Sequence, residues 1–229
     1  MPNSEDWEDP YYDFEVARRK FRVDLTQSAP NFDVPIDCLT DVAAEFRDRG
    51  VQKILDFGAG KLRNTLYLLR RRWNFKVWAV EFKECYETPF AKRQLQAAKR
   101  FRDFFFLEYP KDFLDFDGSF DAALLVNVAN IIPMPEVRVR VLEECAKRLR
   151  SGGVFLWMSQ YGEPNYRPGV TKRLRLNDGW IYNLYKTYQT FVREDYTLDE
   201  IREAVLAHPY RELRRVASRH NRGFLFEKQ

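Results

Sequence analysis

Hydrophobic positions along the chain follow two alternating patterns, one typical of amphipathic helices and one of buried strands. Helical spacing recurs in residues 36–49, 62–72, 89–101 and 136–150. Short apolar runs occupy residues 53–56, 76–81, 103–108, 118–126 and 154–159. Because strand-like and helix-like runs alternate, the pattern predicts an α/β fold built on a doubly wound, mostly parallel sheet.

Two of the predicted strands are unusually rich in apolar residues. Residues 103–108 contain three consecutive phenylalanines followed by Leu107, which predicts a short buried strand. Residues 118–126 are apolar throughout after Asp121, as expected for a strand covered by helices on both faces. This strand ends at Asn127.

The two ends of the chain depart from the alternation. Residues 1–35 contain several prolines and lack clear periodicity, although Asp13–Phe21 could form two helical turns. Residues 161–196 are rich in Tyr, Arg and Pro. Beyond them, Thr197 precedes Glu200 at capping-box spacing, which predicts a helix over 197–207. Two strands, at 211–218 and 223–227, are expected to follow, joined through the turn sequence HNRG.

The composition limits the class of protein. A chain of 229 residues with 45% hydrophobic residues suits one α/β domain with additions. It contains no apolar run long enough for a transmembrane helix, and its acidic N-terminus lacks the layout of a signal peptide. Cys38, Cys85 and Cys145 are odd in number, and none has metal-ligand spacing with a histidine. We therefore expect a cytoplasmic protein without a membrane segment, a disulfide framework or a metal site.

Charge is distributed unevenly around a net value of +4. Residues 1–15 carry six acids and no Lys or Arg, whereas residues 166–223 carry twelve Lys or Arg against seven acids. A basic face of this kind can attract nucleic acid or a phosphorylated substrate. Ordinary solvated surface is the alternative interpretation.

The most informative stretch is residues 52–65, QKILDFGAGKLRNT, where a strand turns into a helix on Gly58 and Gly60. Such glycines let the backbone approach a nucleotide, and the N–H groups at the start of the helix point into the same space. Asp56 ends the first strand. Glu81 ends the next strand, about 20 residues after the glycines, where a carboxylate can accept ribose hydroxyls. An ordinary glycine turn between strand and helix is the alternative.

The negative charge of Asp56 distinguishes between the nucleotide ligands that such a loop could bind. A carboxylate at this loop would repel the pyrophosphate of a dinucleotide. S-adenosylmethionine carries no phosphate, and its ammonium and sulfonium groups would be attracted to Asp56. The sequence therefore favours this cofactor over NAD.

The run DFGAGKLRNTLYLLRRRWNFKVWAVE resembles motif I of the class I S-adenosylmethionine-dependent methyltransferases. Within that class it is most similar to the tellurite-resistance and thiopurine type. Arg63, Asn64, Tyr67 and Leu68 match that type, whereas Leu62 replaces its third glycine. The resemblance implies a Rossmann-like fold, with a seven-stranded sheet whose last strand is antiparallel, and S-adenosyl-L-methionine as cofactor.

The same resemblance implies a set of site residues and a division of the chain. Glu108, Tyr109 or Asp112 would lie near the adenine, with the register left open. Residues 1–35 would form an N-terminal lid or a loose tail, and residues 36–229 the methyltransferase domain, with a cap insertion at about 161–196. The expected cofactor-binding residues are Asp56, Gly58, Gly60, Arg63, Asn64, Glu81, Glu108, Tyr109 and Asn127.

The acceptor is expected beside the end of the fourth strand, at the switch point of the sheet. Asn127 stands there, but no proline follows it directly, so the D/N-P-P-[YFW] motif of amino-group methylases is absent. The Pro-Cys nucleophile needed to attack a pyrimidine carbon is absent as well. The stretch NVANIIP is also similar to the N-V-L-N-V-I run of methyltransferase-like proteins that accompany bacterial DNA-phosphorothioation and phage-defence systems. That similarity suggests Asn127 and Asn130, with Arg138 or Arg140, as polar contacts; alternatively, Asn127 caps the strand.

Methyl transfer from a sulfonium is an in-line displacement in which orientation alone can supply ~7–11 kcal/mol. A catalytic histidine is therefore unnecessary, and Asn127 and Tyr161 are our candidates at the reacting centre. Aromatic residues near Tyr161 could form a wall that stacks a flat substrate or surrounds a cation, or they could be the core of a cap. These are Trp157, Tyr166, Trp180, Tyr182, Tyr185 and Tyr188.

Three functions follow from these residues. The first is an S-adenosylmethionine-dependent methyltransferase acting on a small molecule or on a nucleic acid or nucleotide. The second is a non-catalytic S-adenosylmethionine-binding regulatory subunit, which would need a partner protein, in a bacterial defence or modification system. The third is a nicotinamide-dependent enzyme, which Asp56 argues against.

Overall fold

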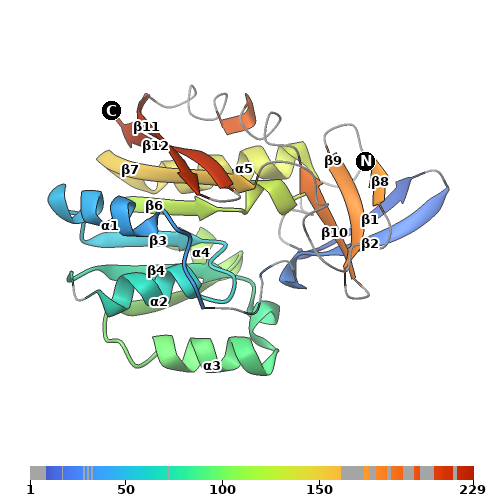
Figure 1. Cartoon of the computed structure of the whole chain (residues 1–229), viewed down its shortest axis with the longest axis horizontal. Coiled ribbons are helices and arrows are strands. Elements are labelled where there is room, and N and C mark those ends of the chain that lie inside the picture. Colours follow the sequence, from blue (N-terminus) through green and yellow to red (C-terminus); the bar gives the residue numbers. More distant parts are fainter. Residues whose placement is uncertain are drawn as a thin grey trace.

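The computed structural model describes residues 9–16, 18–27, 29, 31, 33–71, 73–160, 173–175, 179–184, 187–192, 199–201, 209–218 and 221–229. Within 173–192 it describes the strands of the backbone, and Val192 is the one residue whose side chain is described as well. The described residues form one sheet of seven strands and one of five. Figure 1 shows helices on both faces of the larger sheet and the smaller sheet beside it.

The larger sheet confirms the predicted fold class. Its strand order is β11-β12-β7-β6-β3-β4-β5. The strands from β7 to β5 pair in parallel, and β12 runs antiparallel to both β7 and β11, so the last strand is the antiparallel one. The bounds are β3 (Lys53–Phe57), β4 (Lys76–Glu81), β5 (Phe104–Glu108), β6 (Phe120–Val126), β7 (Leu149–Gln160), β11 (Tyr210–Ser218) and β12 (Asn221–Lys228).

Helices on both faces explain why the central strands are apolar throughout. Ile54 and Leu55 are consecutive in β3 and both fully buried, Ile54 in the cluster of α1 and α2 and Leu55 in that of α4 and α5. α3 packs beside α2. The bounds are α1 (Leu39–Asp48), α2 (Arg63–Arg70), α3 (Pro89–Ala98), α4 (Lys111–Leu114) and α5 (Pro135–Lys147).

The prediction that residues 103–108 form a short buried strand is confirmed as to the strand and wrong as to its burial. The strand exists as β5, but it lies at the edge of the sheet and its residues are only partly buried or exposed. Phe105 is 38% exposed and stacks on Trp78, with ring centroids 4.4 Å apart. An edge position leaves one side of the strand open, which the run of phenylalanines does not reveal.

The smaller sheet combines strands from the N-terminal segment 1–35 with strands from the inserted segment 161–196. Its strand order is β1-β2-β10-β9-β8. β1 and β2 form an antiparallel hairpin, so the helical turns predicted for Asp13–Phe21 are wrong. Tyr12 lies opposite Val23 in this hairpin, both are buried, and Val23 also pairs with Tyr188 of β10. The hairpin thus depends on a strand far away in the sequence. The bounds are β1 (Tyr11–Val16), β2 (Arg19–Asp24), β8 (Arg173–Arg175), β9 (Gly179–Leu184) and β10 (Thr187–Val192).

The smaller sheet lies beyond the carboxyl ends of the parallel strands (Figure 1). β10 packs beside the short helix η4 (Ala129–Ile131), which follows β6. η2 (Leu25–Gln27) follows β2 and packs beside η3 (Lys83–Tyr86), which follows β4. These contacts bring the N-terminal hairpin and the inserted strands to the edge at which open α/β sheets bind ligands.

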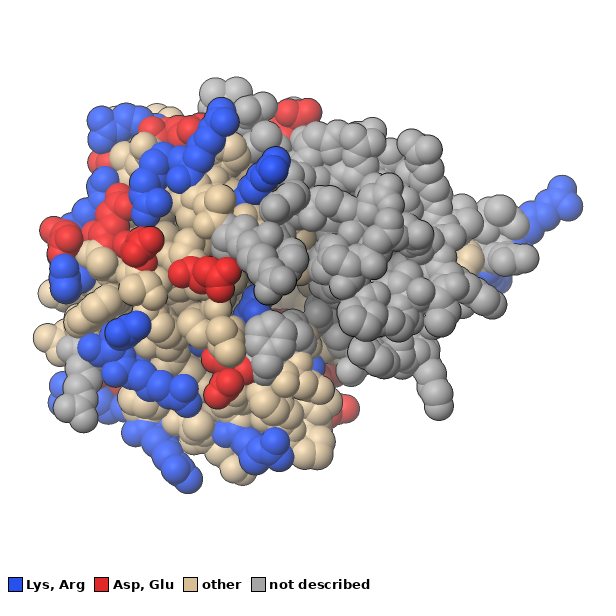
Figure 2. All heavy atoms as spheres, viewed as in Figure 1, with Lys and Arg blue, Asp and Glu red and all other residues tan. Residues whose placement is uncertain are grey.

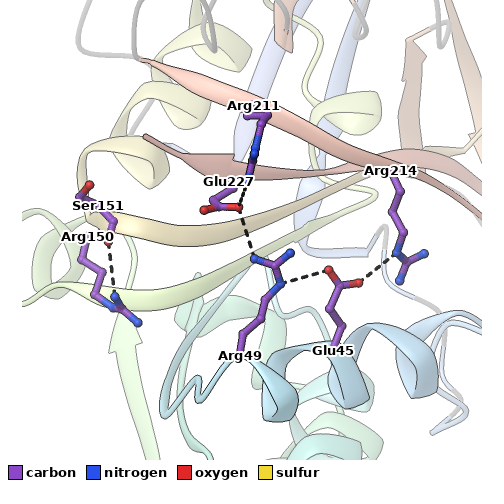
Figure 3. Close-up of polar contacts among 7 residues, drawn as sticks. All are labelled: Glu45, Arg49, Arg150, Ser151, Arg211, Arg214 and Glu227. Carbon is purple, nitrogen blue, oxygen red and sulfur yellow. Dashed lines mark hydrogen bonds and ion pairs between the residues drawn. The ribbon is translucent and has the colours of Figure 1, made fainter.

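The two predicted C-terminal strands are confirmed as β11 and β12. Exposed ion pairs connect this hairpin to α1 (Figure 3): Glu45 pairs with Arg49 at 3.2 Å and with Arg214 at 3.0 Å, and Glu227 pairs with Arg211 at 2.9 Å and with Arg49 at 3.3 Å. Figure 2 likewise shows basic and acidic side chains interspersed on this face. The charge excess of the C-terminal region is thus partly neutralised here by neighbouring acids.

Of the helix predicted over 197–207, residues 199–201 are helical and the others lie outside the described residues. In the described part of the chain, every helix is too short or too polar to cross a bilayer.

Candidate active site

The glycine loop follows β3 and leads into α2. Gly58 and Gly60 have φ values of +64° and +55°, in the left-handed region that favours glycine. A Cβ atom on Gly58 would lie 2.3 Å from Cγ2 of Val128, so a side chain has no room there. The N–H groups of Gly58 and Ala59 both donate to the carbonyl oxygen of Val80, at 3.0 and 3.1 Å. The loop is therefore in contact with β4 and with the segment that follows β6.

Leu62 occupies the position of the missing third glycine and keeps a glycine-like backbone. Its φ and ψ are 64° and 20°, the left-handed conformation. The side chain is fully buried and belongs to the cluster that contains Leu66 of α2 and Tyr86 of η3. Leu62 thus preserves the turn while its side chain fills the core.

Asp56 is buried near the end of β3, with 2% of its surface exposed. Its Oδ2 accepts a hydrogen bond from Oγ1 of Thr65 on α2 at 2.6 Å. Burial raises the pKa of this carboxyl to about 6, against the lowering effect of the Thr65 hydrogen bond. A cation placed beside the loop would favour the ionised form.

Glu81 connects the end of β4 to the glycine loop. Its Oε2 accepts from the N–H of Gly60 at 2.7 Å, and its Oε1 accepts from the N–H of Phe82 at 3.0 Å. Burial raises the pKa of this carboxyl, and the two backbone hydrogen bonds oppose the shift. An ionised carboxylate can accept about four hydrogen bonds, so both oxygens keep capacity for ribose hydroxyls.

The other candidates in α2 have different surroundings. Arg63, at the first turn, is partly buried, which lowers the pKa of its guanidinium, while the charges of Asp56 and Asp37 act in the opposite direction. Asn64 is buried, and its Oδ1 accepts a hydrogen bond from the backbone N–H of Ile36 at 3.3 Å. That bond gives Asn64 a structural role in holding the segment before α1.

Glu108 ends β5 beside Glu81, and Tyr109 follows it. Glu108 is the register partner of Glu81 and forms an ion pair with Lys83 at 3.1 Å. The ring of Tyr109 is buried and packs edge-on against Phe82, with centroids 5.0 Å apart. Asp112 accepts a hydrogen bond from the backbone N–H of Glu108 at 3.1 Å. These residues adjoin the expected nucleoside position.

Lys61 makes a contact that the sequence pattern does not predict. Its Nζ donates to the carbonyl oxygen of Ala29 and to Oδ1 of Asn31, both at 2.7 Å. A Cβ atom on Gly60 would lie 2.8 Å from Cβ of Ala29. The segment that contains Ala29 and Asn31, which we call the strap, therefore passes directly over the glycine loop. The only sequence signal was a lysine within a glycine turn.

The acceptor side begins at Asn127, which has a positive φ of 60°. Its N–H donates to the carbonyl oxygen of Met158 at 2.8 Å, which joins it to β7. Its buried Oδ1 has no hydrogen-bond partner among the described residues. The same holds, within the described part of the chain, for Nδ2 and Oδ1 of Asn130 and for Nε1 of Trp157.

Arg138 is not free to bind a substrate. It is fully buried, its Nε donates to Oε2 of Glu200 at 2.6 Å, and another guanidinium nitrogen donates to the carbonyl oxygen of Ile132 at 2.8 Å. Arg140 is exposed and pairs with Glu144 at 3.5 Å. Neither arginine therefore offers an unoccupied cation to the acceptor.

The predicted aromatic wall is only partly described. Trp157 is buried and stacks on Phe224, with ring centroids 6.1 Å apart, as part of the core. Tyr161, Tyr166 and Tyr185 lie outside the described residues, as do the side chains of Trp180, Tyr182 and Tyr188. Across the residues that are described, no group of three or more His, Cys, Asp or Glu is placed to hold a metal ion.

Comparison with known proteins identifies this arrangement. Residues 55–157 match a family model described as a methyltransferase domain. The match runs from β3 to β7 and includes the glycine loop, Glu81 and Asn127. Residues 55–157 therefore form a methyltransferase domain, on the Rossmann-like sheet of the class I fold. The match to a methyltransferase domain supports S-adenosylmethionine as the cofactor, which the glycine loop and Asp56 predicted.

Solved structures share the fold of this methyltransferase at low sequence identity. One is an S-adenosylmethionine-dependent methyltransferase from Clostridium acetobutylicum, with 13% identity, coverage of 86% of this chain and 93% of that one, and a TM-score of 0.59. Another is 1,6-didemethyltoxoflavin-N1-methyltransferase from Burkholderia thailandensis, solved with 1,6-didemethyltoxoflavin and S-adenosylhomocysteine, with 19% identity, coverage of 84% and 79%, and a TM-score of 0.56.

A third similar structure is the sugar N-methyltransferase KedS8 from Streptoalloteichus, with 14% identity, coverage of 89% of this chain and 90% of that one, and a TM-score of 0.56. A search of curated proteins found no significant match. The comparisons therefore establish the domain class and leave the acceptor open.

Proposed function

We propose that this methyltransferase moves the methyl group of S-adenosylmethionine to an acceptor held between the segment after β6 and the smaller sheet. The observation that carries the proposal is the hydrogen bond between Glu81 and Gly60, because it brings the carboxylate that we expect to hold the ribose next to the glycine loop. Asp56 lies behind the same loop and supplies negative charge. These three residues suit a cationic nucleoside without phosphates.

When bound, S-adenosylmethionine supplies an electrophilic methyl group, which leaves its sulfur when an acceptor lone pair attacks in line. In this proposal Glu81 holds the ribose, and Gly58 and Gly60 let the backbone approach the methionine part. Glu108 and Tyr109 border the adenine. Asn127 faces the acceptor, and the protein's main contribution is orientation and exclusion of water.

We further propose that residues 1–35 act as a lid together with the inserted region at 161–196. The support is that β2 pairs with β10, and that the strap lies on the glycine loop through Lys61. The alternative of a non-catalytic subunit was favoured by the altered third glycine at Leu62 and by the missing acceptor motif, and the left-handed turn at Leu62 removes the first of these two arguments. The predicted roles of Tyr161 and of a partner protein, and the cytoplasmic location, stay predictions.

The test is parallel calorimetric titration with S-adenosylmethionine, S-adenosylhomocysteine and NAD. We expect the two adenosyl ligands to bind and NAD not to bind. Binding of NAD alone, or of none of the three, would contradict the proposal. Transfer of radiolabelled methyl groups to small molecules and to nucleic acids would then separate the acceptor classes, since methylation of nucleic acid should fall steeply with rising salt.

A further inference from the structure

Asn130 has a side chain that the methyltransferase does not use for its own fold. It lies in η4 and is fully buried. Neither its Oδ1 nor its Nδ2 has a hydrogen-bond partner among the residues that the structure describes. We propose that Asn130 is a specificity-determining residue that binds the edge of a neutral, planar nitrogen heterocycle as acceptor; this proposal rests on the proposed function.

The first argument is energetic. Burial of an amide without partners costs the free energy of hydration that both of its ends lose. Native proteins satisfy the large majority of buried polar side-chain atoms, so an amide that is unpaired at both ends calls for an explanation. Leucine has a similar shape and would avoid the cost. A ligand that pairs with both ends is the explanation we favour.

The second argument is position. η4 follows Val128, which contacts the glycine loop at Gly58, and β10 packs beside η4 on the side of the smaller sheet. Asn130 therefore lies in the short segment between the cofactor loop and the inserted strands. In open α/β sheets ligands bind outside the carboxyl ends of the strands, and this segment lies on that side of the sheet.

The third argument is rigidity. Arg138 donates to the carbonyl oxygen of Ile132, directly after η4, and is itself held by two hydrogen bonds to Glu200, at 2.6 and 2.5 Å. Asn127, just before η4, is fixed to β7 through Met158. The segment that carries Asn130 is thus anchored at both ends. A fixed amide can orient a ligand at little further entropic cost.

The chemistry of the amide indicates the ligand class. One face of Asn offers an N–H donor and a carbonyl acceptor side by side, which suits a partner with an adjacent acceptor and donor. The edge of adenine that presents N6 and N7 is such a partner. The buried guanidinium of Arg138 is already engaged by Glu200, so a phosphate or carboxylate would gain no cation from it. A neutral heterocycle therefore fits best.

The experiment uses the full-length protein saturated with S-adenosylhomocysteine. Two probe pairs are used. Adenine and purine differ only in the 6-amino group, and 2-pyridone and pyridine differ in the adjacent N–H donor and C=O acceptor, which pyridine replaces with one ring-nitrogen acceptor. Calorimetry and ligand-observed NMR would measure each affinity in the wild type, in Asn130→Leu, and in Gln96→Leu, which removes an exposed amide from α3. We expect adenine or 2-pyridone to bind the wild type and Gln96→Leu at least tenfold more tightly than its control compound, and Asn130→Leu to lose this difference.

Further readouts separate this inference from the proposed function. Asn130→Leu should bind S-adenosylhomocysteine within twofold of wild type and unfold at no lower urea concentration. A tenfold loss of S-adenosylhomocysteine affinity would assign Asn130 to the cofactor, and a clearly lower unfolding midpoint would assign it to the fold; either overturns the proposal. Equal or absent binding of both members in both pairs would overturn it as well. Failure of the wild type to bind S-adenosylhomocysteine would instead overturn the proposed function.

A last measurement identifies the source of the heterocycle. Single-stranded oligodeoxyadenylate would be titrated against the same complex at two salt concentrations. Tighter, salt-dependent binding that requires Asn130 would indicate a base within a nucleic acid. Binding of free adenine alone would indicate a small molecule. Both results support the recognition of a heterocyclic edge.

Discussion

On the cofactor side of the site, the carboxylates of buried Asp56 and part-buried Glu81 accept hydrogen bonds from α2 and from the glycine loop. On the acceptor side, Asn127 and Asn130 bury polar atoms that have no partner within the described residues. A buried polar group without a partner costs about 1–3 kcal/mol. The protein's own hydrogen bonds fix the carboxylates on the cofactor side, whereas the acceptor side keeps polar groups that a ligand can satisfy.

On the cofactor side, the largest loss of folding stability is expected from Gly58→Ala. The new Cβ would lie 2.3 Å from Cγ2 of Val128, which overpacks the loop, and the φ of +64° strains a residue with a side chain. Together these two effects should lower the free energy of unfolding by about 2–4 kcal/mol. Gly50→Ala is the matched control, because φ is +71° and nothing lies within 4 Å of its Cβ. It should cost only about 1–2 kcal/mol for the left-handed backbone.

Urea unfolding of these variants measures both values. Val128→Ala in the Gly58→Ala background should recover part of the loss, because it removes the Cγ2 atom that the new Cβ would meet. Equal costs at Gly58 and Gly50 would show that the contact with Val128 does not constrain the loop.

The next effect concerns Glu81. Removal of its carboxylate in Glu81→Ala should weaken S-adenosylhomocysteine binding more than tenfold, about 1.4 kcal/mol, through loss of charge-assisted hydrogen bonds to the ribose. Glu87→Ala removes an exposed acid just after η3 and is the control. Calorimetry on both folded variants measures the difference. An unchanged affinity in Glu81→Ala would remove this residue from the cofactor site.

A smaller effect is expected at the strap. Lys61→Met removes the two hydrogen bonds to Ala29 and Asn31 and should lower the unfolding free energy by about 1 kcal/mol. If the strap closes over bound cofactor, dissociation of S-adenosylhomocysteine should also become several-fold faster in stopped-flow measurements. Lys92→Met, on the exposed face of α3, should change neither quantity. An unchanged dissociation rate would show that the strap does not cover the cofactor.

The smallest effect is a pH dependence from Asp56, whose pKa is raised to about 6 by burial. Its contribution to folding stability is full below its ordinary pKa and is lost as the pH rises through about 6. Ionised Asp56 should attract the sulfonium, so the affinity ratio of S-adenosylmethionine to S-adenosylhomocysteine should rise a few-fold from pH 5 to 7. The ratio cancels effects of Glu81 on the shared ribose. Asp56→Asn should make it independent of pH, and a flat wild-type ratio would place the sulfonium elsewhere.

Several features of the fold could be predicted because they depend on neighbouring residues. Ile54 and Leu55 in an apolar run, followed by Gly58 and Gly60, indicated a buried strand that turns into a helix, and the structure contains both. The helical turns expected for Asp13–Phe21 were wrong because hydrogen bonding to β10 was not visible in the local pattern. The local pattern also did not show that β5 lies at the edge of the sheet.

The sequence by itself determined the strands from β3 to β7, the helices α1, α2, α3 and α5, the glycine turn and the two acids beside it, because each depends on residues a few positions apart. Only the tertiary structure decided that Val23 pairs with Tyr188, that Lys61 holds the strap, and that Asn130 is buried without a partner among the described residues. These features arise where segments distant in the chain meet and exclude water from each other. Burial and hydrogen-bond satisfaction are properties of such packed neighbours, and no local pattern encodes them.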